Sequence, residues 1–143
     1  MRHNLQARRE AIVREHCDAE NRSDFAAAVA SFRHPRYEWV GNDTVIEGRD
    51  NVLAQYRSSR LAFPDVQNDI VHLWHCDHAV IIEAWSFGTH LGPLSTLKGV
   101  IPATGRSYRT KIAAVFEFEG DELTCERVYV DNGAVMRQLG LIE

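Results

Sequence analysis

The stretch SYRTKIAAVFEFE (residues 107–119), followed after a short turn by LTCERVYV (residues 123–130), decides the fold class of this chain. Branched and aromatic residues dominate both runs, as is typical of β-strands, and Gly120-Asp121 between them is a turn signal. The two runs therefore predict a long antiparallel hairpin. Both alternating sets of side chains in residues 112–118 contain apolar members, so we expect both faces of this sheet to be covered.

Two further strand candidates precede this hairpin, at residues 66–74 and 79–89, and Cys76-Asp77-His78 forms the turn between them. Four long strands in a row predict a meander. The stretch at residues 91–106, between the two hairpins, is rich in glycine and proline. It can form a loop over the mouth of a pocket or a bulged continuation of the strands.

Helical spacing of apolar residues marks three segments before the meander, at residues 5–21, 25–32 and 49–63, with a short hairpin at residues 37–46. Helices followed by a meander indicate one α+β domain spanning residues 1–143, rather than a doubly wound sheet. A strongly bent antiparallel sheet wrapped around the N-terminal helices would enclose more volume than those helices fill. We therefore expect a pocket inside the domain.

Composition narrows the classes of function. Of the 143 residues, 45% are apolar and 25% are charged, as in ordinary globular proteins, and the net charge is −4 without a basic run. Binding to nucleic acid is therefore not expected, because it requires clustered Lys and Arg. No stretch predicts a membrane span or a signal peptide. The three scattered cysteines argue against a disulfide framework and favour a reducing, cytoplasmic location.

Six short motifs are spread along almost the whole chain. They are IEG (46–48), FPD (63–65), GTHLG (88–92), PATGR (102–106), YVD (129–131) and RQLG (137–140). In this order the motifs resemble the SnoaL-like branch of the NTF2-like superfamily, whose characterised enzymes are polyketide cyclases. The resemblance implies an NTF2-like cone, in which the bent sheet wraps around the N-terminal helices and encloses a pocket.

The same resemblance implies a chemistry. SnoaL-like enzymes close a ring by intramolecular aldol condensation without a metal or an organic cofactor. An aspartate near the end of the last strand is their proposed base, and Asp131 matches it. Other members of the superfamily isomerise ketosteroids, hydrolyse epoxides or dehydrate small phenolic substrates. The isomerase chemistry is disfavoured here, because Trp39, with Glu38 beside it, stands where those enzymes carry their base, although Tyr56 falls near a catalytic tyrosine position.

Asp131 can be read in two ways. In an apolar cavity, burial would raise the pKa of this carboxylate and make it a base that removes a proton α to a carbonyl. At the end of a strand, however, an aspartate can instead cap the following helix by accepting hydrogen bonds from backbone N–H groups. The two roles differ in the direction of the pKa shift, because capping lowers the pKa and apolar burial raises it.

Other residues complete the predicted site. His90, at the end of its strand, could polarise the developing enolate or share a proton with Asp131, or it could simply hold the backbone of the adjacent loop. Four aromatic residues are candidates for the walls of a ligand cavity, although such residues are often part of the core. They are Trp39, Tyr56, Trp85 and Tyr129.

No metal site is expected. The histidine-rich run HLWHCDH (residues 72–78) contains potential zinc ligands, but at a hairpin turn these side chains would splay apart. The chain also has neither a glycine-rich phosphate loop nor a GxSxG motif, so nucleotide use and covalent catalysis are not expected.

Together, these observations predict a cofactor-independent cyclase, isomerase or lyase that acts on a small apolar or aromatic carbonyl compound, with Asp131 as base and His90 as polariser. A non-catalytic ligand-binding module is the alternative, and a purely structural dimer is a third possibility. The expected partner is a second copy of the chain, because a sheet with apolar residues on both faces needs a cover.

Overall fold

The predicted meander forms the greater part of the sheet. The computed structural model describes residues 1–143. Its four long strands are β3 (Gln67–His75), β4 (Ala79–Thr89), β7 (Ser107–Glu119) and β8 (Glu122–Val130). Along the sheet these strands are neighbours in chain order, and each pairs antiparallel with the next. The meander predicted from the sequence is therefore confirmed.

Two short strands extend the sheet beyond β8. β1 (Arg36–Trp39) and β2 (Thr44–Glu47) form an antiparallel hairpin around a 3-10 turn at Val40–Asn42, and the strand order is β2-β1-β8-β7-β4-β3. β1 runs parallel to β8. The expectation of a sheet that is antiparallel throughout was therefore wrong for this one pair of strands. Two strands that are joined by a tight hairpin must run antiparallel. β1 and β8 are far apart in the sequence, so they can pair in parallel.

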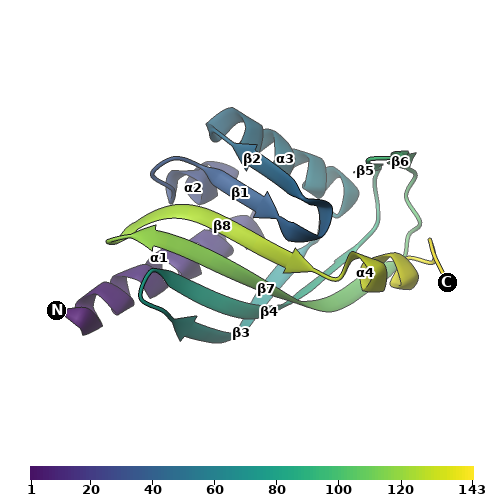
Figure 1. Ribbon diagram of the computed structural model, residues 1–143. Helices are drawn as coiled ribbons and strands as arrows, with labels where there is room; N and C mark the ends of the chain where they lie inside the picture. Colours follow the sequence, from purple (N-terminus) through teal and green to yellow (C-terminus); the bar gives the residue numbers. More distant parts are fainter.

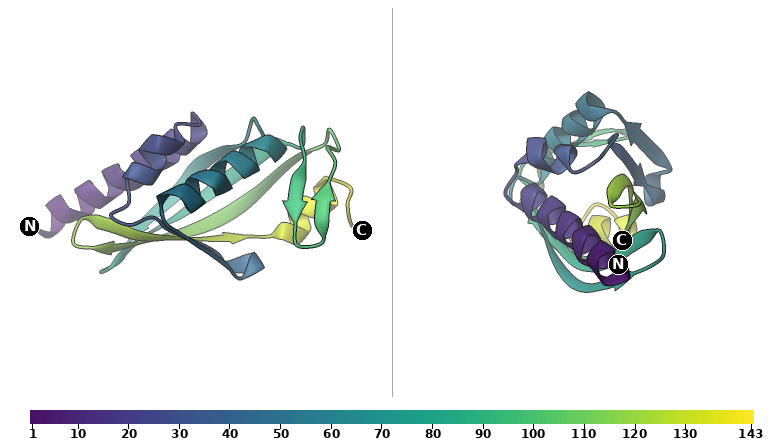
Figure 2. Two further views of the ribbon diagram at one scale, coloured as in Figure 1. Left: turned by 90° about the horizontal axis from the view of Figure 1, so that it is seen from above. Right: turned by 90° about the vertical axis from the view of Figure 1, so that its left-hand side faces the viewer.

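Three helices lie on one side of the sheet, which curls around them (Figure 1, Figure 2). They are α1 (Arg2–Asn21), α2 (Phe25–Ala30) and α3 (Arg49–Ala62), and a fourth helix, α4 (Asn132–Gln138), follows β8 directly. The N-terminus and α4 lie at opposite ends of the molecule (Figure 1). This is the bent α+β arrangement that the sequence predicts. None of the helices is both long and apolar enough to cross a membrane.

Two irregularities accompany the bend of the sheet. The register of the β3–β4 pair shifts between Ile70 and His72, and that of the β7–β8 pair shifts between Glu117 and Phe118. An extra residue on one strand of a pair increases the local right-handed twist and bends that strand. The bulges therefore help the long strands curve around the helices.

The glycine-rich stretch at residues 91–106 leaves the main sheet. Within it, β5 (Leu94–Thr96) and β6 (Gly99–Ile101) pair only with each other. The stretch is tied to the end of α3, since the backbone N–H groups of Leu91 and Gly92 both donate to the carbonyl of Ala62. A Cβ atom at Gly92 would lie 1.9 Å from the carbonyl oxygen of the residue before Ala62, so this close approach requires glycine.

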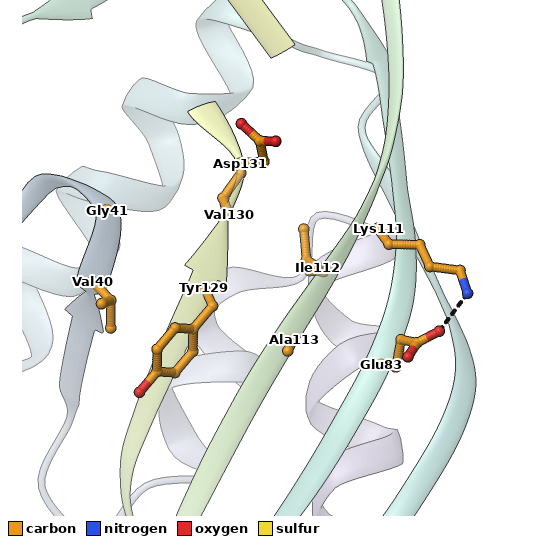
Figure 3. Close-up of a pocket in the computed structure, with 9 residues that line it drawn as sticks. All are labelled: Val40, Gly41, Glu83, Lys111, Ile112, Ala113, Tyr129, Val130 and Asp131. Atoms are coloured by element: carbon orange, nitrogen blue, oxygen red, sulfur yellow. Dashed lines mark hydrogen bonds and ion pairs between the residues drawn. The ribbon is translucent and has the colours of Figure 1, made fainter. Parts of the chain in front are cut away.

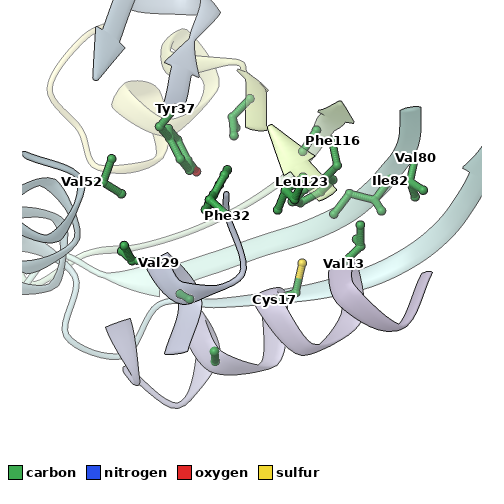
Figure 4. Packing of buried hydrophobic residues seen from close by; sticks show 14 of the residues in the cluster. Val13, Cys17, Val29, Phe32, Tyr37, Val52, Val80, Ile82, Phe116 and Leu123 are labelled. Carbon is green, nitrogen blue, oxygen red and sulfur yellow. The ribbon is translucent and has the colours of Figure 1, made fainter. Parts of the chain in front are cut away.

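The core fills the space between the helices and the concave face of the sheet. Seventeen buried residues form one cluster, in which Val13 and Cys17 of α1 face Phe116 and Leu123 of the strands (Figure 4). The half-buried side chains of Ala113 and Val115 lie on the opposite face, because neighbours along a strand alternate. The outer face of the sheet is therefore partly apolar, as the sequence indicates.

One buried arginine ties α1 to both turns of the meander. The guanidinium of Arg9 donates to the carbonyl of Gly120 at 2.7 Å and to that of Asp77 at 2.9 Å. It also lies over the ring of Phe118, 5.3 Å from the centroid. These contacts hold the turn ends of the two hairpins against the same helix.

Candidate functional site

Three ionisable side chains meet inside the cone. His16 and Glu20 lie one turn apart on α1, and Glu126 points inward from β8. The Nε2 atom of His16 is 3.0 Å from Oε1 of Glu20 and 2.9 Å from Oε2 of Glu126. The exposed fractions of the three residues are 0%, 8% and 4%, respectively. We refer to His16, Glu20 and Glu126 as the interior cluster.

The imidazole of the interior cluster is held on all sides. Its Nδ1 atom lies 3.1 Å from the carbonyl oxygen of Ala28 and 2.8 Å from Oγ of Ser31, both at the end of α2. The rings of Phe32 and Phe116 contact the imidazole edge to face, with centroids 5.3 and 5.7 Å away. The orientation of the His16 ring is therefore set by packing and by hydrogen bonds.

Burial and mutual charge separate the pKa values of the two carboxyl groups. Burial, together with the negative charge of Glu20, raises the pKa of Glu126 to about 7, although His16 opposes the shift. Burial also acts to raise the pKa of Glu20, but the adjacent charge of His16 outweighs it and lowers that pKa. Burial disfavours the charged imidazole, yet Glu126 and Glu20 together raise the pKa of His16 well above its usual value. Near neutral pH, Glu126 is therefore the member of the cluster that gains or loses a proton.

Aromatic residues with free polar atoms surround the cluster. Tyr56 of α3 stacks on Phe25 at 5.3 Å and meets Tyr37 of β1 edge to face at 6.1 Å. Burial, followed by the negative charge of Glu20, raises the pKa of Tyr56. Its hydroxyl group and the indole N–H of Trp39 are buried and have no hydrogen-bond partner. A buried donor without a partner is costly, so both groups are suited to a ligand oxygen.

Asp131 lies outside this interior. It is the N-cap residue of α4, and its Oδ1 accepts a hydrogen bond from the N–H of Ala134 at 2.8 Å. The side chain also borders a hollow of about 500 Å³ on the face of the sheet away from α1 (Figure 3). This hollow is lined by Val40, Gly41, Glu83, Lys111, Ile112, Ala113, Tyr129, Val130 and Asp131.

The structure does not bring His90 to Asp131. His90 is fully buried, its Nδ1 accepts a hydrogen bond from the N–H of Thr104 at 3.3 Å, and its ring packs on Phe63. The N–H of His90 donates to the carbonyl of Arg106, whereas β8 ends beside the middle of β7. His90 thus lies beside one end of β7, and Asp131 lies beside its middle. At the rise of an extended strand, these two positions are about 17 Å apart. The two side chains therefore do not share a proton.

The four predicted aromatic residues lie in two separate places. Trp39 and Tyr56 face the interior, whereas Trp85 and Tyr129 lie on the outer face of the sheet. The guanidinium of Arg109 lies 3.7 Å from the centroid of Trp85, and Tyr129 is 46% exposed. The four therefore do not line one cavity, because each strand residue takes the face that its register dictates.

Glu38 also lies on the outer face, opposite its neighbour Trp39. Hydrogen bonds from Arg36 and Arg127 hold this carboxylate and lower its pKa. A base with a low pKa that is paired to two guanidinium groups is poorly suited to proton abstraction. Glu38 therefore provides no support for the isomerase arrangement that the sequence disfavours.

The histidine-rich turn does not gather its side chains. His72 lies beside Trp74, His75 faces Glu10 of α1 at 3.3 Å, and Asp77 pairs with Arg2. Three potential ligand atoms come within 4.8 Å of one another only in the interior cluster, so that is where a metal ion could be held. The contacts of 2.9 and 3.0 Å within that cluster are hydrogen-bond distances, and a shared proton accounts for them.

Sequence reasoning missed the interior cluster, although signals for it exist. His16 falls on the apolar face of the first predicted helix, and Glu20 follows it at the spacing that places two side chains together. Glu126 shares a strand face with Val128, a buried apolar residue. Charged residues at positions that a pattern assigns to the core are candidates for a functional site.

Comparisons with known proteins agree with this fold. A model of the SnoaL-like domain family matches residues 13–126. None of the curated proteins is matched. A candidate polyketide cyclase from Xanthomonas campestris pv. campestris has a TM-score of 0.80 at 21% identity, over 94% of this chain and 98% of its own. TsrD from Streptomyces laurentii has a TM-score of 0.78 at 22% identity, with coverage of 95% and 97%.

A third structure was solved with a small molecule bound. It is a hypothetical protein of ketosteroid isomerase-like fold from Catenulispora acidiphila, in complex with trimethylamine. Its TM-score is 0.77 at 19% identity, over 92% of this chain and 93% of its own. At such low identities, the likeness to these structures shows a shared fold.

Proposed function

Because this chain belongs to the SnoaL-like domain family, we propose that it is an enzyme that moves protons on a small apolar carbonyl compound without a cofactor. The reaction class is a cyclisation, an isomerisation or an elimination that begins with loss of a proton α to the carbonyl. The observation that carries this proposal is the buried carboxylate of Glu126, which lies 2.9 Å from the imidazole of His16. Burial and the charge of Glu20 raise the pKa of this carboxylate to about 7. A general base works best when its pKa lies near the working pH.

The proposed roles follow from the positions of the side chains. The carboxylate of Glu126 would take the α-proton, and the imidazolium of His16 would hold that carboxylate in place. The hydroxyl of Tyr56 and the indole N–H of Trp39, both without a partner, would donate to the substrate oxygen as negative charge develops there. In this proposal Glu126 replaces Asp131 as the base, because Asp131 caps α4 and faces outward.

The comparisons support the proposed class of substrate only because similar proteins share the fold. A candidate polyketide cyclase shares the architecture, and polyketide chains carry the activated carbonyl groups that such a base would need. The interior cluster lies among buried apolar residues, so a substrate held beside it would be of low polarity.

A non-catalytic binding module remains the second candidate. The complex of a similar fold with trimethylamine favours it, because that protein binds a small molecule in this architecture. In such a module, the interior cluster would recognise a ligand through hydrogen bonds and charge rather than transfer a proton.

Proton exchange in heavy water separates the two candidates. The protein would be incubated in D₂O with a panel of small aromatic and polyketide-like ketones, and deuterium at the α-carbon would be followed by NMR. We expect exchange whose rate rises with pH and levels off above about 7, because the base must be deprotonated to act. Saturable binding without exchange at any pH would contradict the enzyme and leave the binding module.

We also propose that the protein is a cytoplasmic homodimer formed through the outer face of the sheet. Its three cysteines are free, as is usual in a reducing compartment. Tyr129 and Trp74 are exposed on the outer face, and the half-buried Val115 lies on the same face. Light scattering should give twice the mass of the chain, and the substitution Val115→Glu should give the mass of a monomer. A monomeric wild-type protein would contradict this assembly.

A further inference from the structure

The end of α2 fixes the state of one nitrogen of His16. The hydroxyl of Ser31 donates its hydrogen to the carbonyl of Ala28 at 2.6 Å, so its oxygen is free to accept. That oxygen lies 2.8 Å from Nδ1 of His16, and the Ala28 carbonyl, which can only accept, lies 3.1 Å away. Both neighbours of Nδ1 therefore act as acceptors, which requires Nδ1 to carry a hydrogen.

The opposite nitrogen faces two carboxyl groups. Nε2 lies 2.9 Å from Glu126 and 3.0 Å from Glu20. With Nδ1 already protonated, a bare Nε2 lone pair would point at two oxygens that also carry lone pairs. One proton at Nε2 removes this repulsion and makes the ring an imidazolium, which can donate to both carboxylates.

Resting on the function proposed above, we propose that Ser31 is a positioning residue. Together with the Ala28 carbonyl, it keeps His16 as an imidazolium of fixed orientation, so that the proton taken from the substrate goes to the Glu126 carboxylate and not to the ring. His16 then acts as a fixed positive charge rather than as a proton shuttle. In many acid/base sites, by contrast, the imidazole itself transfers the proton.

The proton-transfer step balances on these groups. An oxygen of the Glu126 carboxylate takes the α-proton, and the electron pair of the broken C–H bond moves to the carbonyl oxygen of the substrate to give an enolate. Both N–H groups of His16 stay in place throughout. When the enolate reacts further, Glu126 returns its proton to the product or to water, and the cluster regains its starting charge.

The titratable groups that surround His16 come from four elements. α2 contributes only backbone and the Ser31 hydroxyl, and β7 contributes the ring of Phe116. The groups are Cys17 and Glu20 of α1, Tyr37 of β1, Tyr56 and Arg60 of α3, and Glu126 of β8. Burial raises the pKa of Cys17 and those of the two tyrosines. Between pH 5 and pH 8, the charge of the cluster therefore changes mainly at Glu126.

The substitution Ser31→Ala tests the proposal in the free protein, without a substrate. Ring-nitrogen NMR of selectively labelled histidine would follow His16 from pH 5 upward until its titration is complete. Loss of one hydrogen bond to a charged group should lower the pKa of His16 by about one unit. Ser31→Thr, which keeps a hydroxyl group, should restore the wild-type titration. Ser59→Ala removes a comparable hydroxyl that bonds only the backbone of Tyr56, and it should leave His16 unchanged.

The outcomes are distinct. An unchanged His16 titration in Ser31→Ala, or an equal change in Ser59→Ala, would overturn the positioning role. A wild-type Nδ1 that loses its hydrogen between pH 5 and pH 8 would overturn it as well. Once a substrate is known, Ser31→Ala should lower kcat about fivefold with little change in KM. If His16 behaves as expected and no ketone exchanges deuterium, the proposed function fails while the fixed imidazolium stands.

Discussion

Replacing Glu126 by glutamine should lower turnover by roughly 10²–10⁴-fold, the usual contribution of a general base, for any compound that the wild-type protein exchanges. Glutamine keeps the shape of the side chain and can still accept a hydrogen bond from Nε2 of His16, but it cannot take a proton. KM should change little, since the amide preserves the walls of the site. Deuterium exchange and thermal unfolding of the same samples would separate lost chemistry from lost structure.

The matched control is Asp131→Asn. Asparagine is as good an N-cap residue as aspartate, so α4 should stay folded, and the variant should exchange protons at close to the wild-type rate. The reverse pattern, with activity lost in Asp131→Asn and kept in Glu126→Gln, would return the base to the end of β8. If both variants keep the wild-type activity, neither carboxylate is the base.

Removing the cation of the interior cluster should produce the largest loss of stability. We expect His16→Gln to lower the free energy of unfolding at pH 8 by about 3–5 kcal/mol, because two buried carboxylates then face each other without a positive charge between them. Chemical denaturation at pH 8 would measure this change. His75→Gln is the control: His75 meets Glu10 near the surface, and such pairs contribute about 1 kcal/mol or less.

The loss in His16→Gln should shrink as the solution becomes more acidic. Without the imidazolium, both carboxyl groups have folded-state pKa values above those of the unfolded chain. The folded variant then binds more protons than the unfolded one at intermediate pH, so its stability rises as the pH falls. The wild-type protein should show a weaker trend of the same sign between pH 4.5 and about pH 7, because the pKa of Glu126 is raised over that range.

At higher pH the wild-type protein should lose a second contribution to its stability, which comes from His16. Because the folded-state pKa of His16 is raised, its stabilisation is complete below 6.5 and disappears as the pH rises through the folded value. A double variant, His16→Gln with Glu126→Gln, should recover much of the lost stability at pH 8, since one buried charge is gone. Equal stability of His16→Gln at pH 5 and pH 8 would contradict this account of the cluster.

Strand and helix positions could be predicted because they depend on short-range patterns. Side chains along β7 alternate between more buried and more exposed positions, and a glycine and an aspartate mark the turn into β8. The cap of α4 was also visible, since Asp131 stands where a strand ends and a helix begins. The parallel pairing of β1 with β8 left no local signal, because it joins segments that are remote in the sequence.

The α+β meander, the family and the residue types available for acid/base chemistry could all be recognised from the amino-acid sequence. Which carboxylate is buried depends on how the folded chain brings distant segments together. Asp131 and Glu126 both lie at the end of the chain, yet the register of β8 turns Glu126 toward His16, and the following helix draws Asp131 to its N-terminus. A pKa depends on burial and on charges brought together from distant segments, so a local pattern can identify candidate carboxylates but not select between them.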